Sequence, residues 1–249
     1  MRPDTERLWS LLKTQPELKG FTLVGGTALA LHLGHRVSED LDFMIKANKL
    51  PRRRIEALKR ECAEAGFEFL SVDSVGALAE FEDTGMDYAD YQQDYMVGGT
   101  VKLTLVAPDP EVARLLREGT ESGPRIAGID EIFQLKCIAC ANRTKSRDWL
   151  DVYMMLKAGY FQPSNIYLAF ELAGVPSKLD IAMMRMTTGV PGITDEGYVS
   201  LLDNPPSLDE MRSYFKQVFN EMQIEVTAMK ARALAQTQTQ TPQGKCLLD

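Results

Sequence analysis

Two aspartates, Asp40 and Asp42, are the side chains of this sequence whose type and spacing first suggest chemistry. Leu41 to Ile45 has the composition of a strand. In a strand, a spacing of two places both carboxylates on one face, while Leu41 and Phe43 point to the other. Two adjacent carboxylates repel each other unless a cation lies between them. Because magnesium prefers hard oxygen ligands, the pair predicts a Mg²⁺ site.

A glycine turn lies upstream of this pair. Phe21 to Val24 is expected to be a short buried strand that stops at Gly25-Gly26, and Thr27 to Leu33 is expected to be a helix. Backbone N–H groups at a helix N-terminus stabilise a phosphate. Taken alone, the glycines could form a simple tight turn and the acids could be solvated carboxylates at a strand end. Their succession indicates magnesium-dependent nucleotide chemistry.

A second group of charges lies on two later helices. Asp130 is expected to cap the helix EIFQLKCIACANR, on which Lys136 and Arg143 share one face. Two cations on a largely apolar helix need an anionic partner. Ser146 is expected to cap the next helix, SRDWLDVYMML, which is apolar nearly all round and should be buried. It nevertheless carries two acids, Asp148 and Asp151.

Two interpretations of these acids stay open at this stage. They could form an internal ion-pair set with Arg143, Lys145 and Arg147, because such networks occur in proteins without any function. Alternatively, they could belong to a reactive site together with the cations.

The motifs, in this order, resemble those of the AbiEii/AbiGii-type toxin nucleotidyltransferases of the DNA polymerase β-like superfamily. The first motif is GGT at 25–27, then Arg36 and Ser38, then Asp40 and Asp42. The family's K-L-x5-R motif has its counterpart in Lys136-Cys137 and Arg143, with Cys in place of the usual Leu. Its D-x-x-[KD] motif has its counterpart in Asp148 and Asp151. The matched stretches cover roughly residues 20–158.

The resemblance implies an α+β fold, with a minimal mixed nucleotidyltransferase sheet flanked by helices and followed by a helical C-terminal region. It also implies transfer of a nucleoside monophosphate from an NTP to a hydroxyl, with pyrophosphate as leaving group. Asp40 and Asp42 would hold Mg²⁺. Asp148 would act as the base or orient the acceptor. The residues expected to bind the nucleotide are Gly25, Gly26, Thr27, Arg36, Ser38, Lys136, Arg143 and Asp151.

One departure from the superfamily pattern concerns the third carboxylate, which usually lies on a neighbouring strand. VKLTLV at 101–106 is expected to be that strand, with Thr104 at the equivalent position, and threonine cannot act as a base. Asp148 or Asp151 could fill the role, or Asp109 could move in, or the protein could be catalytically weak.

The resemblance also implies partners. A toxin of a toxin–antitoxin or phage-defence system is expected, with tRNA as acceptor and a cognate antitoxin protein. The alternative is a nucleotide-binding or partner-binding module on the same fold that is weakly active or inactive.

Composition sets the general frame. The chain has 249 residues, of which 45% are hydrophobic and 25% charged, as in ordinary globular proteins. Its net charge of −7 does not exclude a nucleic-acid substrate, because a local basic groove is sufficient. The basic residues of the helix after Pro51 are therefore either a solvated surface or part of a phosphate-binding track. No stretch has the length of a membrane span and no signal peptide is evident, so a cytoplasmic location without membrane contact is expected.

Hydrophobic patterning divides the chain into three segments. The resemblance implies that residues 1–120 form the nucleotidyltransferase core and that 121–235, which read as mainly helical, complete the site; the polar composition of 236–249 predicts a disordered tail. Strands are expected at 67–72, 78–83 and within 92–106, with a turn at Gly98-Gly99. Helices are expected at 4–15, 110–118 and 207–234.

Overall fold

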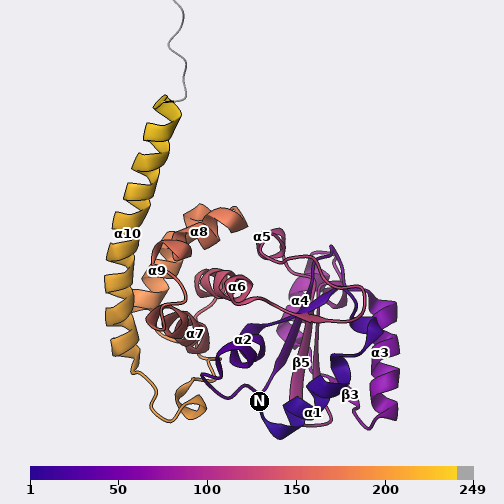
Figure 1. The fold of residues 1–249 in the computed structure, drawn as a ribbon. Helices are drawn as coiled ribbons and strands as arrows, with labels where there is room; N and C mark the ends of the chain where they lie inside the picture. Colours follow the sequence, from indigo (N-terminus) through magenta and orange to yellow (C-terminus); the bar gives the residue numbers. More distant parts are fainter. Residues whose placement is uncertain (240–249) are drawn as a thin grey trace, which may run out of the picture.

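Six strands form one mixed sheet in the computed structural model, which describes residues 1–239 (Figure 1). In chain order they are β1 (Phe21–Val24), β2 (Leu41–Ile45), β3 (Phe69–Ser71), β4 (Gln92–Val97), β5 (Val101–Val106) and β6 (Arg125–Ile126). The spatial order is β3-β4-β5-β2-β1-β6. The pairs β2–β5 and β1–β6 are parallel, and the others are antiparallel.

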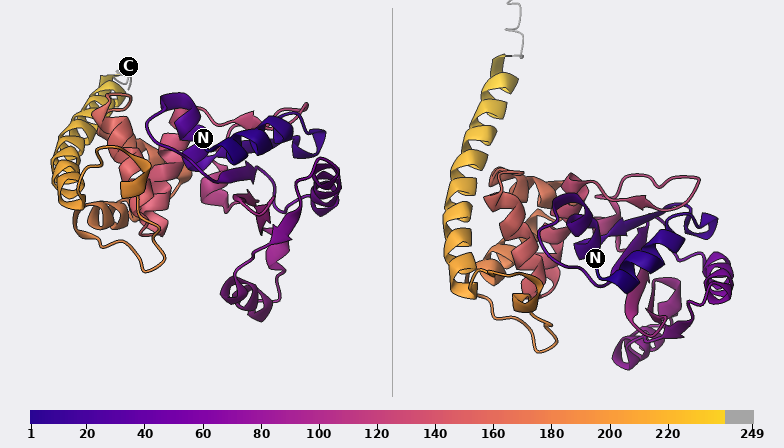
Figure 2. Two further views of the ribbon diagram at one scale, coloured as in Figure 1. Left: turned by 90° about the horizontal axis from the view of Figure 1, so that it is seen from below. Right: turned by 60° about the horizontal axis from the view of Figure 1, so that its bottom comes forward.

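Ten α-helices flank and follow the sheet within the described residues. They are α1 (Pro3–Leu12), α2 (Gly25–Leu33), α3 (Arg52–Glu64), α4 (Val75–Asp83), α5 (Pro110–Ala113), α6 (Ile129–Asn142), α7 (Ser146–Lys157), α8 (Ser164–Ala173), α9 (Leu179–Thr188) and α10 (Leu208–Thr239). Helix α10 packs along α7, α8 and α9, on the side of the helical region away from the sheet (Figure 2). The predicted architecture, a mixed sheet with flanking helices and a helical C-terminal region, is confirmed.

Alternation along β2 separates the core from the reactive side of the sheet. Phe43 is fully buried and lies against Trp9 of α1, with ring centroids 6.2 Å apart. Ile55 of α3 is buried in the same core. Asp42, the neighbour of Phe43, points to the opposite face because successive side chains of a strand alternate. The apolar helices therefore cover one face, and the carboxylate is left on the other.

The structure corrects two expectations about elements. Residues 78–83, expected to be a strand, lie in helix α4, where Phe81 packs edge-on against Tyr88. Leu78 and Phe81 are three residues apart, a spacing that also fits one face of a helix. The helix expected at 110–118 is the single turn Pro110–Ala113.

Two predicted helix caps are also wrong. At the start of α6, the backbone N–H of Gly128 donates to Glu131 Oε2 at 2.9 Å, so Glu131 rather than Asp130 satisfies that end. Ser146 is already the first residue of α7, and its hydroxyl bonds to Asp195 at 2.5 Å.

At the C-terminal end, α10 extends to Thr239, so residues 236–239 of the expected tail are helical. The remainder of that tail, 240–249, lies outside the described residues. Among residues 1–239, no helix is long and apolar enough to cross a membrane.

Candidate active site

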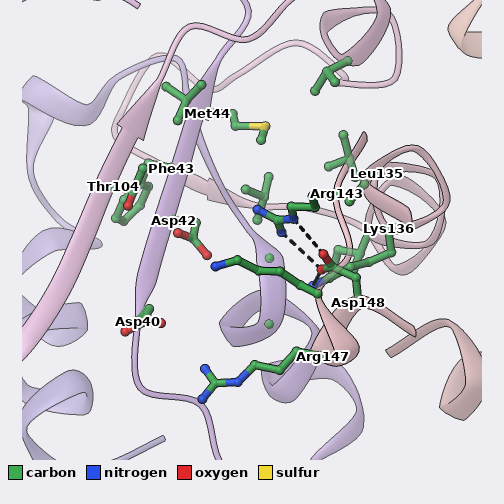
Figure 3. A pocket seen from close by; sticks show the side chains of 18 of the residues that line it. Asp40, Asp42, Phe43, Met44, Thr104, Leu135, Lys136, Arg143, Arg147 and Asp148 are labelled. Atoms are coloured by element: carbon green, nitrogen blue, oxygen red, sulfur yellow. Dashed lines mark hydrogen bonds and ion pairs between the residues drawn. The ribbon is translucent and has the colours of Figure 1, made fainter. Parts of the chain in front are cut away.

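A cavity of about 470 Å³ lies between the polar face of the sheet and helices α6 and α7 (Figure 3). Most of the residues that the sequence singles out line it, although they come from segments more than a hundred positions apart. Those lining the cavity are Gly25, Gly26, Arg36, Ser38, Asp40, Asp42, Lys136, Arg143 and Asp148. Two predicted residues, Thr27 and Asp151, lie behind this lining.

The glycine turn is shaped by its neighbours. Gly25 has a φ of +70°, and a Cβ built on it would come 2.5 Å from Asp42 Oδ2. A Cβ on Gly26 would collide with the guanidinium of Arg36. Only glycine at these two positions lets Asp42 and Arg36 approach the start of α2 this closely. The turn is therefore part of the site and not merely a link between β1 and α2.

Thr27 fixes the segment that leads into β2. It is buried, and its hydroxyl bonds to Ser38 Oγ at 2.7 Å and to the carbonyl oxygen of Asp40. The side chain of Thr27 is thus occupied by the protein itself. Its effect on the site is to hold residues 38–40 in place before the strand begins.

Asp40 and Asp42, the two carboxylates of the β2 motif, form no salt bridge with any Lys or Arg of residues 1–239. The pKa of Asp40 is raised to about 6 by burial, by Asp42 and by Glu196, against weaker opposing effects of Lys102 and Arg147. Burial also raises the pKa of Asp42, although Lys136 opposes the shift. Both raised pKa values mean that negative charge is unfavourable here until a cation arrives.

A buried ion-pair network lies on the other side of the cavity. Asp148 accepts from Lys136 Nζ and from Arg143 Nε, each at 2.7 Å. Asp151 lies 2.8 Å from Lys136 Nζ and accepts from Arg36 Nε at 2.9 Å. His35 Nε2 contacts Asp151 as well, at 3.1 Å. Lys136 therefore bridges the two acids of α7.

The network keeps its acids ionised. Burial alone would raise the pKa of Asp148, but Lys136 and Arg143 outweigh it and lower that pKa. The pKa of Asp151 lies well below its ordinary value. Burial would raise it, but the charge of Lys136, the hydrogen bond with His35 and the ion pair with Arg36 outweigh that effect. Arg36, Lys136 and Arg143 bring three positive charges to two carboxylates, so one positive charge remains uncompensated at the cavity wall.

The cations of this network differ from those of the internal ion-pair set that the sequence suggested. Arg143 belongs to it, as expected. Arg147 instead pairs with Glu196 at 2.9 Å and donates to the carbonyl oxygen of Gly197 at 2.7 Å. The set also contains Lys136, for which the sequence indicated an anionic partner, and Arg36, whose approach to α7 no local pattern reveals.

Strand β5 lies where the sequence predicted it. Thr104 is in register with Asp42 across the β2–β5 pair, so both side chains face the cavity. Asp109, considered as a replacement acid, precedes α5 and is not among the residues lining the cavity. Within residues 1–239 no group of three or more acidic, histidine or cysteine side chains is close enough to hold a metal.

The donor set that is present nonetheless fits magnesium. This ion is commonly bound through one or two carboxylates, with waters and substrate phosphates as its other ligands. Asp40 and Asp42 provide the two carboxylates. The pKa of each is raised, and a divalent cation would lower both by stabilising the ionised carboxylates.

Sequence reasoning missed five charged lining residues: Asp94, Lys102, Lys145, Arg147 and Glu196. Lys102 is exposed and lies two positions before Thr104, so strand alternation could have placed it on the cavity face. Asp94 is in register with Thr104 across the β4–β5 hairpin. Glu196 comes from the loop after α9, where the sequence carries no signal for it.

The basic helix α3 makes contacts of a different kind. Arg52 pairs with Asp87 and Asp90, and Arg54 donates to the carbonyl oxygen of Lys19. Among the described residues, none of α3 lines the cavity. Its cations are therefore separate from those of the site.

Known proteins place these features in a family. Residues 7–178 match the family of nucleotidyl transferase AbiEii toxins of type IV toxin–antitoxin systems. No curated protein matches the chain.

Three solved structures align with most of this chain. MenT4, a nucleotidyltransferase toxin from Mycobacterium tuberculosis H37Rv, has a TM-score of 0.54 and 12% identity, over 88% of this chain and 82% of that one. JHP933 from Helicobacter pylori has a TM-score of 0.49 and 19% identity, over 92% of this chain and 97% of that one. A structure described as a putative nucleotidyltransferase from H. pylori has a TM-score of 0.47 and 20% identity, over 88% of this chain and 95% of that one. The family match covers more than half of the sequence and agrees with the sheet and the motif order, so the chain belongs to the AbiEii family of toxin nucleotidyltransferases.

Proposed function

We propose that the protein transfers a nucleoside monophosphate from an NTP to a hydroxyl of an RNA acceptor, with tRNA as the expected substrate, in a magnesium-dependent reaction. The observation that carries the proposal is the division of charge within one cavity. Asp40 and Asp42 form one wall, where no Lys or Arg of the described chain forms a salt bridge with them, and the Lys136 network forms the opposite wall with a surplus of positive charge. A triphosphate with its metal ion complements both walls.

The phosphates would lie between the glycine turn and α6. Gly25 and Gly26 open α2, where N–H groups without helical partners attract a phosphate oxygen. Arg143 is half-exposed while its Nε and Nη2 donate to Asp148, so the rest of its guanidinium stays available to a ligand. Lys136 adds a fixed positive charge. Hydrogen bonds from such charged donors are about twice as strong as neutral ones.

Magnesium held by Asp40 and Asp42 would neutralise the charge that develops on the phosphates during transfer. The oxygen of the acceptor hydroxyl forms a bond to the α-phosphorus. The bond from that phosphorus to the bridging oxygen breaks, pyrophosphate leaves, and the hydroxyl proton is released to water.

Asp148 is assigned a positioning role in this scheme. Its lowered pKa makes it a weak base, and its two oxygens are already bonded to Lys136 and Arg143. It therefore fixes the two cations for the phosphates, and Asp151 does the same for Lys136 and Arg36.

The acceptor and the partner protein are inferred from the family and from the rim of the cavity. Lys102, Lys145 and Arg147 line the cavity outside the ion-pair network, where a polynucleotide backbone would pass. Membership of a family described by type IV toxin–antitoxin systems supports a toxin that acts together with a cognate antitoxin.

A second function is favoured by one observation. In the described part of the chain, no third carboxylate joins Asp40 and Asp42 closely enough to share a metal. A module that binds nucleotide or a partner without turnover would have this property. The two functions differ in whether label from the nucleotide becomes covalently attached to an acceptor.

The experiment incubates the protein with total tRNA and each of the four NTPs, radiolabelled at the α-phosphate, in magnesium and in EDTA. The proposal predicts labelled RNA with at least one NTP in magnesium and none in EDTA. Tight NTP binding without labelled RNA under any condition would contradict transfer and support the binding module.

A further inference from the structure

Asp94 is a buried carboxylate of the cavity that has no role in the proposed transfer reaction. It is 7% exposed and lines the same cavity as Asp42. Tyr88 Oη and Gln92 Nε2 donate to its Oδ2 at 3.2 and 2.7 Å, and Thr104 Oγ1 donates to its Oδ1 at 2.8 Å. No Lys or Arg of the described chain forms a salt bridge with it. A buried acid that is hydrogen-bonded but has no cationic partner costs stability, so a function is expected.

The position of Asp94 follows from strand register. Asp42 pairs with Thr104 across β2 and β5, and Thr104 pairs with Asp94 across β5 and β4. Directly paired residues point to the same face of a sheet. The three side chains therefore form one row on the cavity face, with Thr104 in the middle.

Asp94 determines how the hydroxyl of Thr104 is used. A hydroxyl has one hydrogen to donate and two lone pairs to accept with, whereas an ionised carboxylate only accepts. Thr104 gives its hydrogen to Asp94, so its lone pairs are left for a donor in the cavity. Without Asp94 the hydroxyl could rotate and present its hydrogen instead.

The position of the cationic wall indicates which group would donate a hydrogen bond to Thr104. Asp42 lies between Thr104 on one side and Lys136 and Arg143 on the other (Figure 3). If the phosphates, and so the leaving pyrophosphate, lie on the cationic side, the attacking oxygen must approach from the other side, because phosphoryl transfer needs the two oxygens roughly in line. That side is the one occupied by Thr104.

We propose that Asp94 is a positioning residue that holds the Thr104 hydroxyl as the hydrogen-bond acceptor for the attacking hydroxyl of the RNA. This inference rests on the proposed function and adds to it the residues that orient the acceptor. Asp94 and Thr104 then do jointly, across two strands, part of what a carboxylate at position 104 would do alone.

The substitution Asp94→Asn tests this with little change of shape. Tyr88 and Gln92 both donate to Oδ2, so the amide oxygen must occupy that position and the NH₂ group must face Thr104. The amide then donates to Thr104, whose hydroxyl turns its hydrogen toward the cavity. Thr104→Val removes the hydroxyl at nearly constant volume, and Thr104→Ala is the replacement if the valine variant does not fold. Thr104→Ser keeps the hydroxyl.

The assay measures kcat and KM for labelling of total tRNA, the NTP dissociation constant, and the melting temperature of each variant. Asp94→Asn and Thr104→Val should each lower turnover about 10- to 100-fold, the scale for a misplaced reactant, with NTP affinity within about twofold of wild type. Thr104→Ser should restore most of the rate. The double variant should be no slower than Thr104→Val, because Asp94 acts through Thr104.

Thr22→Val is the matched control, since Thr22 is a buried threonine of the same sheet that does not line the cavity. Wild-type turnover in Asp94→Asn, or single effects that multiply in the double variant, would overturn the inference. Asp42→Asn separates this from the proposed function. Transfer that persists in Asp42→Asn refutes the proposed site. Transfer lost in Asp42→Asn but kept in Asp94→Asn refutes the positioning role alone.

Discussion

Replacing Asp40 by asparagine should stabilise the metal-free protein. The ordinary pKa of this carboxyl is 3.8, and in the folded protein it is raised to about 6 by burial and by Asp42 and Glu196. Between these two values the folded state keeps a proton that the unfolded chain has lost. The free energy of unfolding therefore falls as pH rises through this interval, and it stays lower above it.

The size of the effect follows from the shift. About two pKa units correspond to roughly 3 kcal/mol, at 1.36 kcal/mol per unit. Asp40 is only partly buried, so solvent screening reduces this to about 1–2 kcal/mol. For a chain of this size, each kcal/mol changes the melting temperature by about 2–4 °C. Asp40→Asn should therefore melt about 2–8 °C above wild type in EDTA near neutral pH.

Thermal unfolding across about pH 4 to 8 checks this prediction, with Asp203→Asn as the control because Asp203 is exposed. The gap between Asp40→Asn and wild type should close below about pH 4, where both side chains are neutral. Magnesium should raise the melting temperature of wild type more than that of the variant. A variant that melts lower than wild type in EDTA, or a gap that does not change with pH, would refute the reasoning.

Three further substitutions test two residues of the ion-pair network and one cation of the cavity that lies outside it. Lys136→Ala should weaken NTP binding in calorimetry by about 1.5–3 kcal/mol, whereas Arg53→Ala on α3 should leave it unchanged; equal losses would remove the distinction between the two sets of cations. Asp148→Ala should lower the free energy of unfolding by about 3–5 kcal/mol in denaturant titrations, because the buried Lys136 loses one of its two carboxylates. Unchanged stability with a rate about 10²–10⁴ lower would instead identify Asp148 as a base. Lys102→Met should weaken NTP or RNA binding in a salt-dependent way, and wild-type affinity for both at low salt would exclude Lys102 from the substrate site.

Local patterns were sufficient to predict the first half of the site. Strand alternation predicted that Asp42 and Phe43 point to opposite faces of the sheet, and the glycine turn marked the start of α2. Thr104 was predicted beside Asp42 because the family resemblance identified its strand. These features depend on residues close in sequence or on a motif of fixed order.

The remaining features depend on contacts between distant segments. Arg36 and Asp151 are 115 positions apart, so their ion pair could not be read from the periodicity of either segment. Asp94 needed the register of a hairpin that hydrophobic patterning does not fix in detail. The mistaken strand at 78–83 arose because a short apolar run fits a strand or a helix equally well, and packing of Phe81 against Tyr88 and Tyr91 accompanies the helix.

The central claim is that the carboxylate pair supports covalent transfer of a nucleotide. The most direct measurement compares wild type with Asp42→Asn for incorporation of α-labelled NTP into tRNA in magnesium, after circular dichroism has shown that both are folded. The account predicts labelled RNA with wild type and none above background with the variant. Equal labelling by the two proteins would contradict it.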